Sequence, residues 1–290
     1  MNNATLDAAT LASQIAYDCL LFVLDETTST NDEVVRKACE LANLPAVPLV
    51  VLSSTQTSGR GRLGRLWASP VGGLYLSVLL DAGVAEDNTG CLASLSPLVA
   101  LATRDALQAF TGSELLVKWP NDVLVAEGKL AGKLEGKLEG KSAGKLVGIL
   151  IEAKPASALC NNASGTSQFV VIGIGINVNR PSAEAHESAA YLNDGSDQNL
   201  QLESVASAVI NELLKQVAAW QAEGCSFGSF LSSYTSHMAK IGEAVSVRNA
   251  YGDEIAQGTI SGIDEFGRLL LQYAHETIAV VSGEVTLKNS

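Results

Sequence analysis

Two glycines inside an apolar segment restrict the folds open to this chain more than any other feature. The segment FVVIGIGINVN (169–179) reads as a buried strand, with Gly173 and Gly175 in its interior. A dinucleotide-binding fold would need the pattern GxGxxG opening into a helix, whereas Asn177 and Asn179 follow here. Glycine within a strand more often marks the close approach of a ligand or another backbone. The segment therefore argues against a Rossmann-type site and predicts a close contact on this strand.

The chain divides into a longer part of mixed elements and a shorter part of strands alone. In the first part, strands are expected at 48–54, 73–80, 115–125 (broken at Pro120), 147–153 and 169–179, and helices at 91–110 and 204–224. A strand and a helix are also expected within 19–44, where Thr30 and Glu33 have the spacing of a capping box. From about Lys240, short strands separated by turns indicate a small all-β module. We therefore predict a mixed α/β domain followed by a small β domain.

Charge and composition argue against several classes of protein. The 290 residues carry a formal net charge of −12, whereas a duplex-binding surface needs a concentrated basic patch, so we expect no nucleic-acid partner. The N-terminus lacks a signal peptide's basic region, and no apolar run approaches the roughly 20 residues of a membrane span. Five scattered cysteines without a CxxC pair fit reduced thiols. We expect a soluble, cytoplasmic protein with no membrane partner.

A glycine- and arginine-rich loop, GRGRLGRLW (59–67), is the first candidate for chemistry. Its three glycines weaken local order, while Arg60, Arg62 and Arg65 supply planar donors suited to phosphate or carboxylate. Such a loop could close over an anionic ligand, and Trp67 could stack on a flat ring. An ordinary basic surface loop, or one that binds RNA backbone, has the same composition, and this motif alone leaves those alternatives open.

Two further segments carry lysines in distinctive settings. KWPND (118–122) places Lys118 and two polar side chains around a proline that interrupts a strand, which suits either a pocket lining or a simple bulge. From residue 129 the unit KLxG recurs, with lysine at every fourth position: Lys129, Lys133, Lys137, Lys141 and Lys145. The glycine of each unit disfavours both helix and strand by roughly 0.5–1 kcal/mol. We interpret the middle units as a solvated low-complexity insertion.

Five motifs, taken in order, resemble those of biotin–protein ligases. They are TSTN (28–31), QTSGRGRLGRLW (56–67), KWPND (118–122), KLVGILIE (145–152) and VIGIGINVN (171–179). The resemblance covers roughly residues 20 to 288 and implies an α/β fold: a mixed-sheet, class II synthetase-like catalytic domain with a small C-terminal SH3-like β-barrel. It implies a polar leader at 1–18, the catalytic domain at 19–238 with the repeat inserted at 129–144, and the SH3-like domain at 239–290. Fewer than about 30 residues precede TSTN, too few for the three ~11–12-residue helices of a winged helix, so we expect the monofunctional form.

The resemblance also implies an activity. Biotin and MgATP would form biotinyl-5′-AMP, and biotin would pass to a lysine of the biotin carboxyl carrier domain of a carboxylase such as acetyl-CoA carboxylase. Biotin would contact Ser29, Thr30, Asn31, Gln56, Gly59, Arg60, Arg62, Lys145, Gly148, Gly173 and Gly175. ATP would contact Arg62, Arg65, Trp67, Lys118, Asn121 and Asn177. The catalytic residues implied are Arg60, Arg62, Lys118 and Lys145. No side chain is implied as a direct metal ligand, because Mg²⁺ would arrive with ATP. A homodimer is left open.

The family's reactive lysine begins the pattern KxxGxLxE. Lys145 heads the full pattern, whereas Lys129 keeps the family's distance from KWPND, so two candidates remain and we favour Lys145. A lipoate–protein ligase of the same fold and a non-catalytic biotin-binding or regulatory module are the alternative functions. The pairing of GRGRLGR with KWPND favours biotin over lipoate. The presence of Arg60, Lys118 and Lys145 argues against a module without catalysis.

Overall fold

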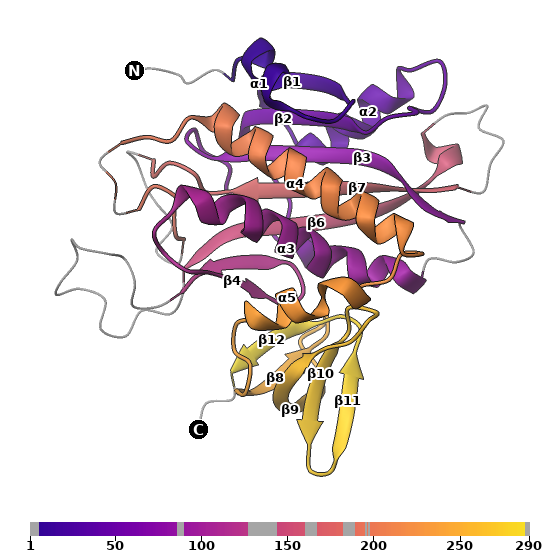
Figure 1. Ribbon diagram of the computed structural model, residues 1–290, viewed down its shortest axis with the longest axis vertical. Helices are drawn as coiled ribbons and strands as arrows, with labels where there is room; N and C mark the ends of the chain where they lie inside the picture. Colours follow the sequence, from indigo (N-terminus) through magenta and orange to yellow (C-terminus); the bar gives the residue numbers. More distant parts are fainter. Residues whose placement is uncertain are drawn as a thin grey trace.

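The computed structural model describes residues 6–85, 90–126, 144–159, 167–181, 189–194, 196 and 198–287. Over these residues, seven strands form a mixed sheet and five more form a separate antiparallel sheet (Figure 1). The larger sheet has the order β1-β2-β3-β7-β6-β5-β4, with β1 (Leu20–Thr27), β2 (Leu49–Gln56), β3 (Leu74–Ala85), β4 (Leu115–Lys118), β5 (Asp122–Val125), β6 (Lys145–Pro155) and β7 (Ser167–Ile176). The smaller sheet has the order β11-β10-β9-β8-β12, with β8 (Ala244–Arg248), β9 (Glu254–Ile263), β10 (Leu269–Tyr273), β11 (Glu276–Val280) and β12 (Glu284–Leu287). The α-helices of the described residues are α1 (Ala8–Gln14), α2 (Thr30–Cys39), α3 (Leu95–Leu107), α4 (Leu202–Ala222) and α5 (Leu231–Ser236).

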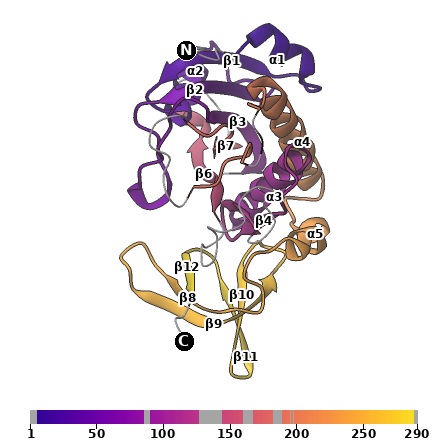
Figure 2. The ribbon, with the colours of Figure 1, turned by 90° about the vertical axis from the view of Figure 1, so that its left-hand side faces the viewer.

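Helices cover both faces of the larger sheet, so its central strands are apolar on both sides. Helices α3 and α4 pack together over one face, and α2 packs against β2, β3 and β7 on the other (Figures 1 and 2). Alternate residues of β2 divide between the two cores: Val50 and Leu52 face the core under α3 and α4, while Leu49 and Val51 face the core under α2. Because side chains alternate across a strand, a doubly covered strand requires the run of consecutive apolar residues seen here.

Strand β7 lies in the middle of the larger sheet, between β3 and β6. On the face toward α3 and α4 it presents a continuous apolar row. On the opposite face Phe169 and Val171 are buried beside α2, but the next two positions are Gly173 and Gly175. The apolar cover of this face therefore stops where the glycines begin, which leaves space above the strand for side chains from elsewhere.

The start of α2 differs from the expected capping box. The helix begins at Thr30, and among the described residues the Ser29 side chain caps none of its N–H groups. Thr30 instead contacts Gln56 Oε1, with its N–H donating at 2.8 Å and its hydroxyl at 3.1 Å. Glu33 accepts a hydrogen bond from Arg36 at 2.9 Å. The predicted Thr30–Glu33 box was therefore wrong, because a contact from a neighbouring strand occupies the threonine.

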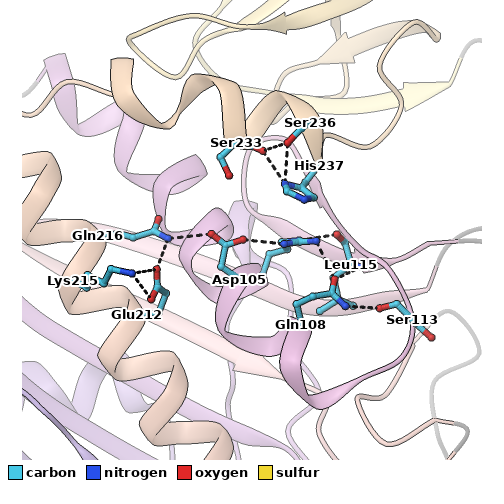
Figure 3. A network of polar contacts seen from close by, with 11 residues as sticks. Asp105, Gln108, Ser113, Leu115, Glu212, Lys215, Gln216, Ser233, Ser236 and His237 are labelled. Atoms are coloured by element: carbon cyan, nitrogen blue, oxygen red, sulfur yellow. Dashed lines mark hydrogen bonds and ion pairs between the residues drawn. The ribbon is translucent and has the colours of Figure 1, made fainter.

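A polar network fixes the start of β4 against α3 (Figure 3). Arg104 of α3 donates to the Leu115 carbonyl and to Gln108 Oε1, each at 3.0 Å, and Gln108 Oε1 also accepts from the Leu115 N–H at 3.1 Å. Helix α4 joins through Gln216, whose Nε2 donates to Asp105 at 3.2 Å. The far end of β4 carries a predicted site lysine, so this network holds one wall of the candidate site in place.

The smaller sheet is joined to the larger one near the end of β4. The Trp119 indole Nε1 donates to the Gly267 carbonyl at 2.9 Å, and the Phe227 N–H donates to the Glu265 carbonyl at 3.1 Å. Both acceptors lie in the turn between β9 and β10, so this turn packs against the residue that follows β4 and against the segment that follows α4. The connection matters for the site because β12, from the same small sheet, reaches the pocket.

The predicted fold class is confirmed, since a mixed α/β domain precedes a small antiparallel β module. The expected polar leader contains α1, which buries Leu11 and packs against α4. The domain boundaries at 18/19 and 238/239 stay predictions. Lys129, Lys133, Lys137 and Lys141, within the predicted insertion, lie outside the described residues. None of the described helices combines the length and the apolar character that crossing a bilayer requires.

Candidate active site

A pocket of about 160 Å³ lies over the glycine-bearing face of β6 and β7. Its walls come from the start of α2, the end of β2, the 59–67 loop, the KWPND segment and the start of β12. Most of the predicted site residues line it: Ser29, Thr30, Asn31, Gln56, Arg60, Arg62, Arg65, Trp67, Lys118, Asn121, Lys145, Gly148, Gly173 and Gly175. The fold thus gathers motifs from both ends of the chain into one site.

One corner of the pocket is built from neutral polar side chains that hold one another. The Ser77 hydroxyl lies 2.8 Å from Thr30 Oγ1 and 2.6 Å from Asn31 Oδ1. Asn31 Nδ2 donates to Glu152 Oε2 at 2.8 Å, which fixes which way its amide faces. Gln56 Nε2 donates to the Ser69 hydroxyl at 2.9 Å. These contacts preorganise the corner, because each donor or acceptor already has a defined direction.

The strand glycines leave room for the side chains that cross them. A Cβ on Gly173 would stand 2.1 Å from Asn31 Oδ1, and one on Gly175 would stand 2.4 Å from Trp67 Nε1. A Cβ on Gly148 would meet the Trp67 ring at 2.7 Å. The strand glycines do mark a close approach, but side chains approach them where a ligand or another backbone was expected. The approaching groups are Asn31 on one glycine and Trp67 on two others.

Each arginine of the 59–67 loop is anchored to a different part of the molecule. Arg60 Nη2 donates to Asp32 Oδ1 of α2 at 2.7 Å, and this hydrogen bond lowers the pKa of the Asp32 carboxyl. Arg65 Nη1 donates to Glu284 Oε1 of β12 at 2.7 Å and lowers the pKa of that carboxyl in the same way. The structure thus describes the loop in a folded state, held to α2 by Arg60 and to β12 of the smaller sheet by Arg65.

Arg62 differs from its two neighbours because its hydrogen-bond partners are neutral oxygens. It donates to Asn121 Oδ1 at 3.1 Å and to the Gly283 carbonyl at 3.4 Å. The side chain is half-buried, and burial lowers the pKa of its guanidinium, with the nearby Asp122 and Glu284 opposing that shift. A half-buried cation facing neutral oxygens offers positive charge to an anionic ligand.

Lys145 stands at the head of β6 and points into the pocket. Its Nζ lies 2.7 Å from Asp122 Oδ1 and 5.1 Å from the centroid of the Trp67 ring. Its carbonyl accepts hydrogen bonds from Asn177 Nδ2 at 3.2 Å and from the Ala190 N–H at 3.0 Å. The backbone and the ammonium of Lys145 are therefore both fixed, as a charge-stabilising group requires.

Two predicted residues lie behind the pocket wall. Gly59 is buried beneath the loop, where a Cβ would stand 2.5 Å from the Trp67 carbonyl. Asn177 holds the backbone at the start of β6, because its N–H also donates to the Leu146 carbonyl at 3.0 Å. Both residues support neighbours that face the pocket.

Other residues of the site were not predicted. Asp122 and Glu152 belong to the motifs KWPND and KLVGILIE, so a carboxylate within each lysine-containing motif was a usable signal. Ser77 is one polar residue in an apolar strand, and it is fully buried. Glu284 begins β12 at the end of the segment SGE, whose sequence indicates only a turn, and its partner Arg65 lies 219 positions away. No local pattern could have found that contact.

The comparisons with known proteins agree with this geometry. The family described as the biotin/lipoate A/B protein ligase family matches residues 23–177, and the biotin protein ligase C-terminal domain matches residues 240–288. The biotin–[acetyl-CoA-carboxylase] ligase of Paracoccus denitrificans is 32% identical, over 86% of this chain and 93% of its own. Its counterpart from Mycobacterium tuberculosis is 29% identical, over 91% of this chain and 88% of its own. The structure of a biotin protein ligase from Aquifex aeolicus in complex with biotin and ATP is 26% identical and superposes with a TM-score of 0.69, covering 94% of this chain and 99% of that one.

Proposed function

We propose that this chain, which belongs to the biotin/lipoate A/B protein ligase family, is a biotin–protein ligase. It joins biotin to AMP with release of pyrophosphate, then passes the biotinyl group to a lysine of a carboxylase's biotin carboxyl carrier domain. The observation that carries the proposal is the lining of the pocket. Five cationic side chains of the described residues line it together with a group of neutral polar side chains, and both groups lie above the glycines of β6 and β7. Two anionic substrates that must react together need such a combination.

The neutral polar corner is assigned to the ureido ring of biotin. Ser29, Thr30, Asn31 and Gln56 offer hydrogen-bond donors and acceptors there, and their contacts with one another reduce the ordering needed on binding. Gly173 lets the Asn31 amide lie against the strand, and the largely apolar ring system is placed beside that amide. The carboxylate arm of biotin then points toward Lys145 and the loop arginines.

The opposite part of the pocket is assigned to ATP. Arg62, Lys118 and Asn121 face the phosphates, Arg65 supports the loop above them, and Trp67 offers its ring to adenine. Gly59 and Asn177 act through their neighbours: the first permits the loop to pack, and the second holds the backbone of the reactive lysine. These assignments are the ones that the resemblance implied, and the presence of these side chains in and behind the pocket lining supports them.

The reaction then needs two displacement steps. In the first, a carboxylate oxygen of biotin attacks the α-phosphorus of ATP, and the bond from that phosphorus to the bridging oxygen breaks as pyrophosphate leaves. Lys145, held by Asp122 at 2.7 Å, stabilises the charge that develops on the α-phosphate. In the second, the amine of the acceptor lysine attacks the acyl carbon, and AMP leaves. The 59–67 loop shields the acyl-adenylate from water between the steps.

Mg²⁺ would accompany ATP, and the residues present fit an ion held mainly by phosphates. In the part of the chain that the structure describes, no group of three or more His, Cys, Asp or Glu side chains could hold a metal by itself. Mg²⁺ at ATP sites usually takes one or two carboxylates and keeps several waters. Among the described residues that line the pocket, Asp122 and Glu284 are the carboxylates that could contribute, and the ion would supply neutralisation of phosphate charge.

The acceptor is expected to be a protein and not a nucleic acid, in keeping with the net charge of −12. The cytoplasmic location and a homodimer stay predictions. A lipoate–protein ligase is the competing activity within the same family, and the test must include its substrate.

A single-turnover assay tests the proposal directly. The full chain, in excess over α-labelled ATP with Mg²⁺, is mixed with biotin, with lipoate or with neither, and no acceptor is added. We expect biotinyl-AMP and one equivalent of pyrophosphate with biotin only. If adenylate forms with lipoate in preference to biotin, the chain is a lipoate–protein ligase and not a biotin–protein ligase. No adenylate with either acid would remove the enzymatic assignment.

A further inference from the structure

Glu152 stands on β6 beside the pocket and not in its lining. Of the described residues of this strand, Gly148 and Leu150 line the pocket and Glu152 does not. Because side chains alternate along a strand, Gly148 and Glu152 are on the same face of the sheet. Glu152 is in register with Val171 of β7, two positions before Gly173, where the Asn31 amide crosses the strand. The carboxylate therefore stands next to the neutral polar corner of the pocket.

The two carboxylate oxygens of Glu152 have different partners. Oε1 lies 3.7 Å from Lys154 Nζ, in an ion pair whose side chains are 30% and 32% exposed, and such pairs contribute little. Oε2 accepts a hydrogen bond from Asn31 Nδ2 at 2.8 Å and lies 3.7 Å from Arg60 Nη2. Arg60 is held more closely by Asp32, at 2.7 Å. The hydrogen bond to Asn31 is therefore the principal contact of Glu152.

This hydrogen bond selects one of the two orientations open to the Asn31 amide. Turning the amide over exchanges its oxygen and its nitrogen with almost no change of shape. A carboxylate oxygen accepts hydrogen bonds and cannot donate one, so Glu152 requires the orientation with Nδ2 toward it. Asn31 Oδ1 then faces the Ser77 hydroxyl at 2.6 Å and accepts its proton. Asn31 is 5% exposed and Ser77 is fully buried, so both depend on protein partners.

The same direction of donation continues to Thr30. The Ser77 hydroxyl also donates to Thr30 Oγ1, at 2.8 Å. Thr30 in turn gives its own hydroxyl proton to Gln56 Oε1, at 3.1 Å. With that proton used, the Thr30 oxygen can only accept a hydrogen bond from a ligand, which must then bring an N–H or O–H group. The ureido ring of biotin carries N–H groups, whereas the dithiolane ring of lipoate carries none.

We infer that Glu152 is a positioning residue for biotin recognition: by fixing the Asn31 amide, it sets which groups of the polar corner donate and which accept. The inference rests on the proposed function, because it concerns the same site. Glu152 contacts neither substrate and acts through Asn31, Ser77 and Thr30. The corner has its donors and acceptors in place before the ligand arrives, so little binding free energy is lost in reorienting them.

Glu152→Ala removes the acceptor and leaves the Asn31 amide free to turn over. We expect biotin affinity to fall about 10–100-fold, because a hydrogen bond to a charged group is lost and a buried amide is left unpaired. The corner holds biotin alike before and during the reaction, so KM for biotin should rise while kcat and KM for ATP are kept. A general loss of folding would not produce that split. Glu152→Gln keeps an acceptor oxygen and should lose less affinity.

The experiment is a double-mutant cycle on the full chain, with biotin binding measured by isothermal titration calorimetry without ATP. The proteins are the wild type, Glu152→Ala, Asn31→Ala and the double variant. Because Glu152 acts through Asn31, the double variant should bind biotin as weakly as Asn31→Ala does and no more weakly. Lys154→Ala is the matched control: it removes the contact of the other carboxylate oxygen and should bind biotin like the wild type.

Three results would overturn the inference. One is unchanged biotin affinity in Glu152→Ala. Another is a double variant in which the two losses multiply, because Glu152 would then act independently of Asn31. The third is Glu152→Gln as impaired as Glu152→Ala, which would assign the effect to charge and not to the hydrogen bond. If Glu152→Ala fails to fold, Glu152→Gln takes its place in the cycle.

The binding measurement also separates this inference from the proposed function, since calorimetry requires no turnover. Wild-type protein that binds biotin but forms no adenylate would contradict the proposed function, while the variants would still test Glu152. Adenylate formation by the wild type, with biotin affinity unchanged in Glu152→Ala, would contradict the inference alone.

Discussion

At the scale of single residues, the pocket depends on glycines whose missing Cβ atoms are replaced by side chains from other elements. Asn31 occupies that space over Gly173, and Trp67 occupies it over Gly148 and Gly175. Separations of 2.1–2.7 Å cannot be relieved by small adjustments, because the neighbours are themselves hydrogen-bonded or packed. The strand glycines thus decide where the ligand-facing groups stand.

Gly173→Ala tests this dependence. The added methyl group would displace the Asn31 amide, so we expect biotin affinity to fall about 10–100-fold, a loss of about 1.4–2.8 kcal/mol by isothermal titration calorimetry. Gly112→Ala is the matched control, since a Cβ there meets nothing within 4 Å. Unchanged affinity in Gly173→Ala would separate Asn31 from biotin binding.

Lys145→Ala tests the proposal that Lys145 is the reactive lysine. Loss of one preorganised charge-stabilising group should lower the rate of adenylate formation by about 10²–10³, measured in single-turnover kinetics. Lys133→Ala and Lys137→Ala serve as controls from the same repeat and should be near neutral. If Lys129→Ala abolishes activity while Lys145→Ala does not, the insertion follows the reactive lysine.

Residue roles were predictable only where a motif carried them. The sequence pointed to Arg60, Arg62 and Lys118 as cations of one site, and all three line the pocket. The hydrogen-bond partners of these cations were not predictable, because each partner lies in a segment whose sequence indicates only a local helix, strand or turn. The capping box failed for the same reason: Thr30 has the right spacing, but Gln56 from β2 takes its hydroxyl.

At the scale of elements, the 59–67 loop is held in place by separate side-chain hydrogen bonds to α2, to the KWPND segment and to β12. Its turn places Leu63 and Gly64 in the left-handed region, with φ of 58° and 72°, which glycine adopts readily and leucine rarely does. The sequence indicated an anion-binding loop, but neither its folded shape nor its anchors. Those depend on tertiary contacts that no local pattern contains.

We expect Arg62→Ala to weaken the retention of biotinyl-AMP under the 59–67 loop. With its contacts to Asn121 and Gly283 removed, the loop retains biotinyl-AMP less well. We expect adenylate released to solution to increase relative to biotin transferred, in a chase experiment with limiting acceptor. Arg268→Ala, which breaks an arginine–carboxylate pair outside the pocket, is the control. Equal retention in both variants would remove Arg62 from this role.

Deletion of residues 129–144 tests the repeat as an element. It joins Gly128 to Lys145 and removes an even number of residues, so side-chain facing along an extended strand is preserved. We expect ligase activity to be kept within a few fold of the full chain, measured as biotin transfer. An inactive but folded deletion variant would give the repeat a function in the reaction.

At the scale of the whole molecule, the pocket belongs to two sheets at once. The larger sheet supplies the floor and the lysines, and the smaller sheet supplies Gly283, Glu284 and Val285. The composition and strand pattern were enough to predict the two folding units and their order. They could not predict that the second unit completes the first one's site, because that follows from how β12 docks beside the loop.

Transfer to a carrier domain is the most direct test of the proposed function. The full chain, ATP, Mg²⁺ and an equimolar mixture of biotin and lipoate are incubated with a purified biotin carboxyl carrier domain, and intact mass is recorded. We predict one biotinyl group on one lysine, which requires ATP and is lost when that lysine is replaced by arginine. Modification by lipoate, or tight binding of biotin with no transfer under any of these conditions, would contradict the assignment of this chain as a biotin–protein ligase.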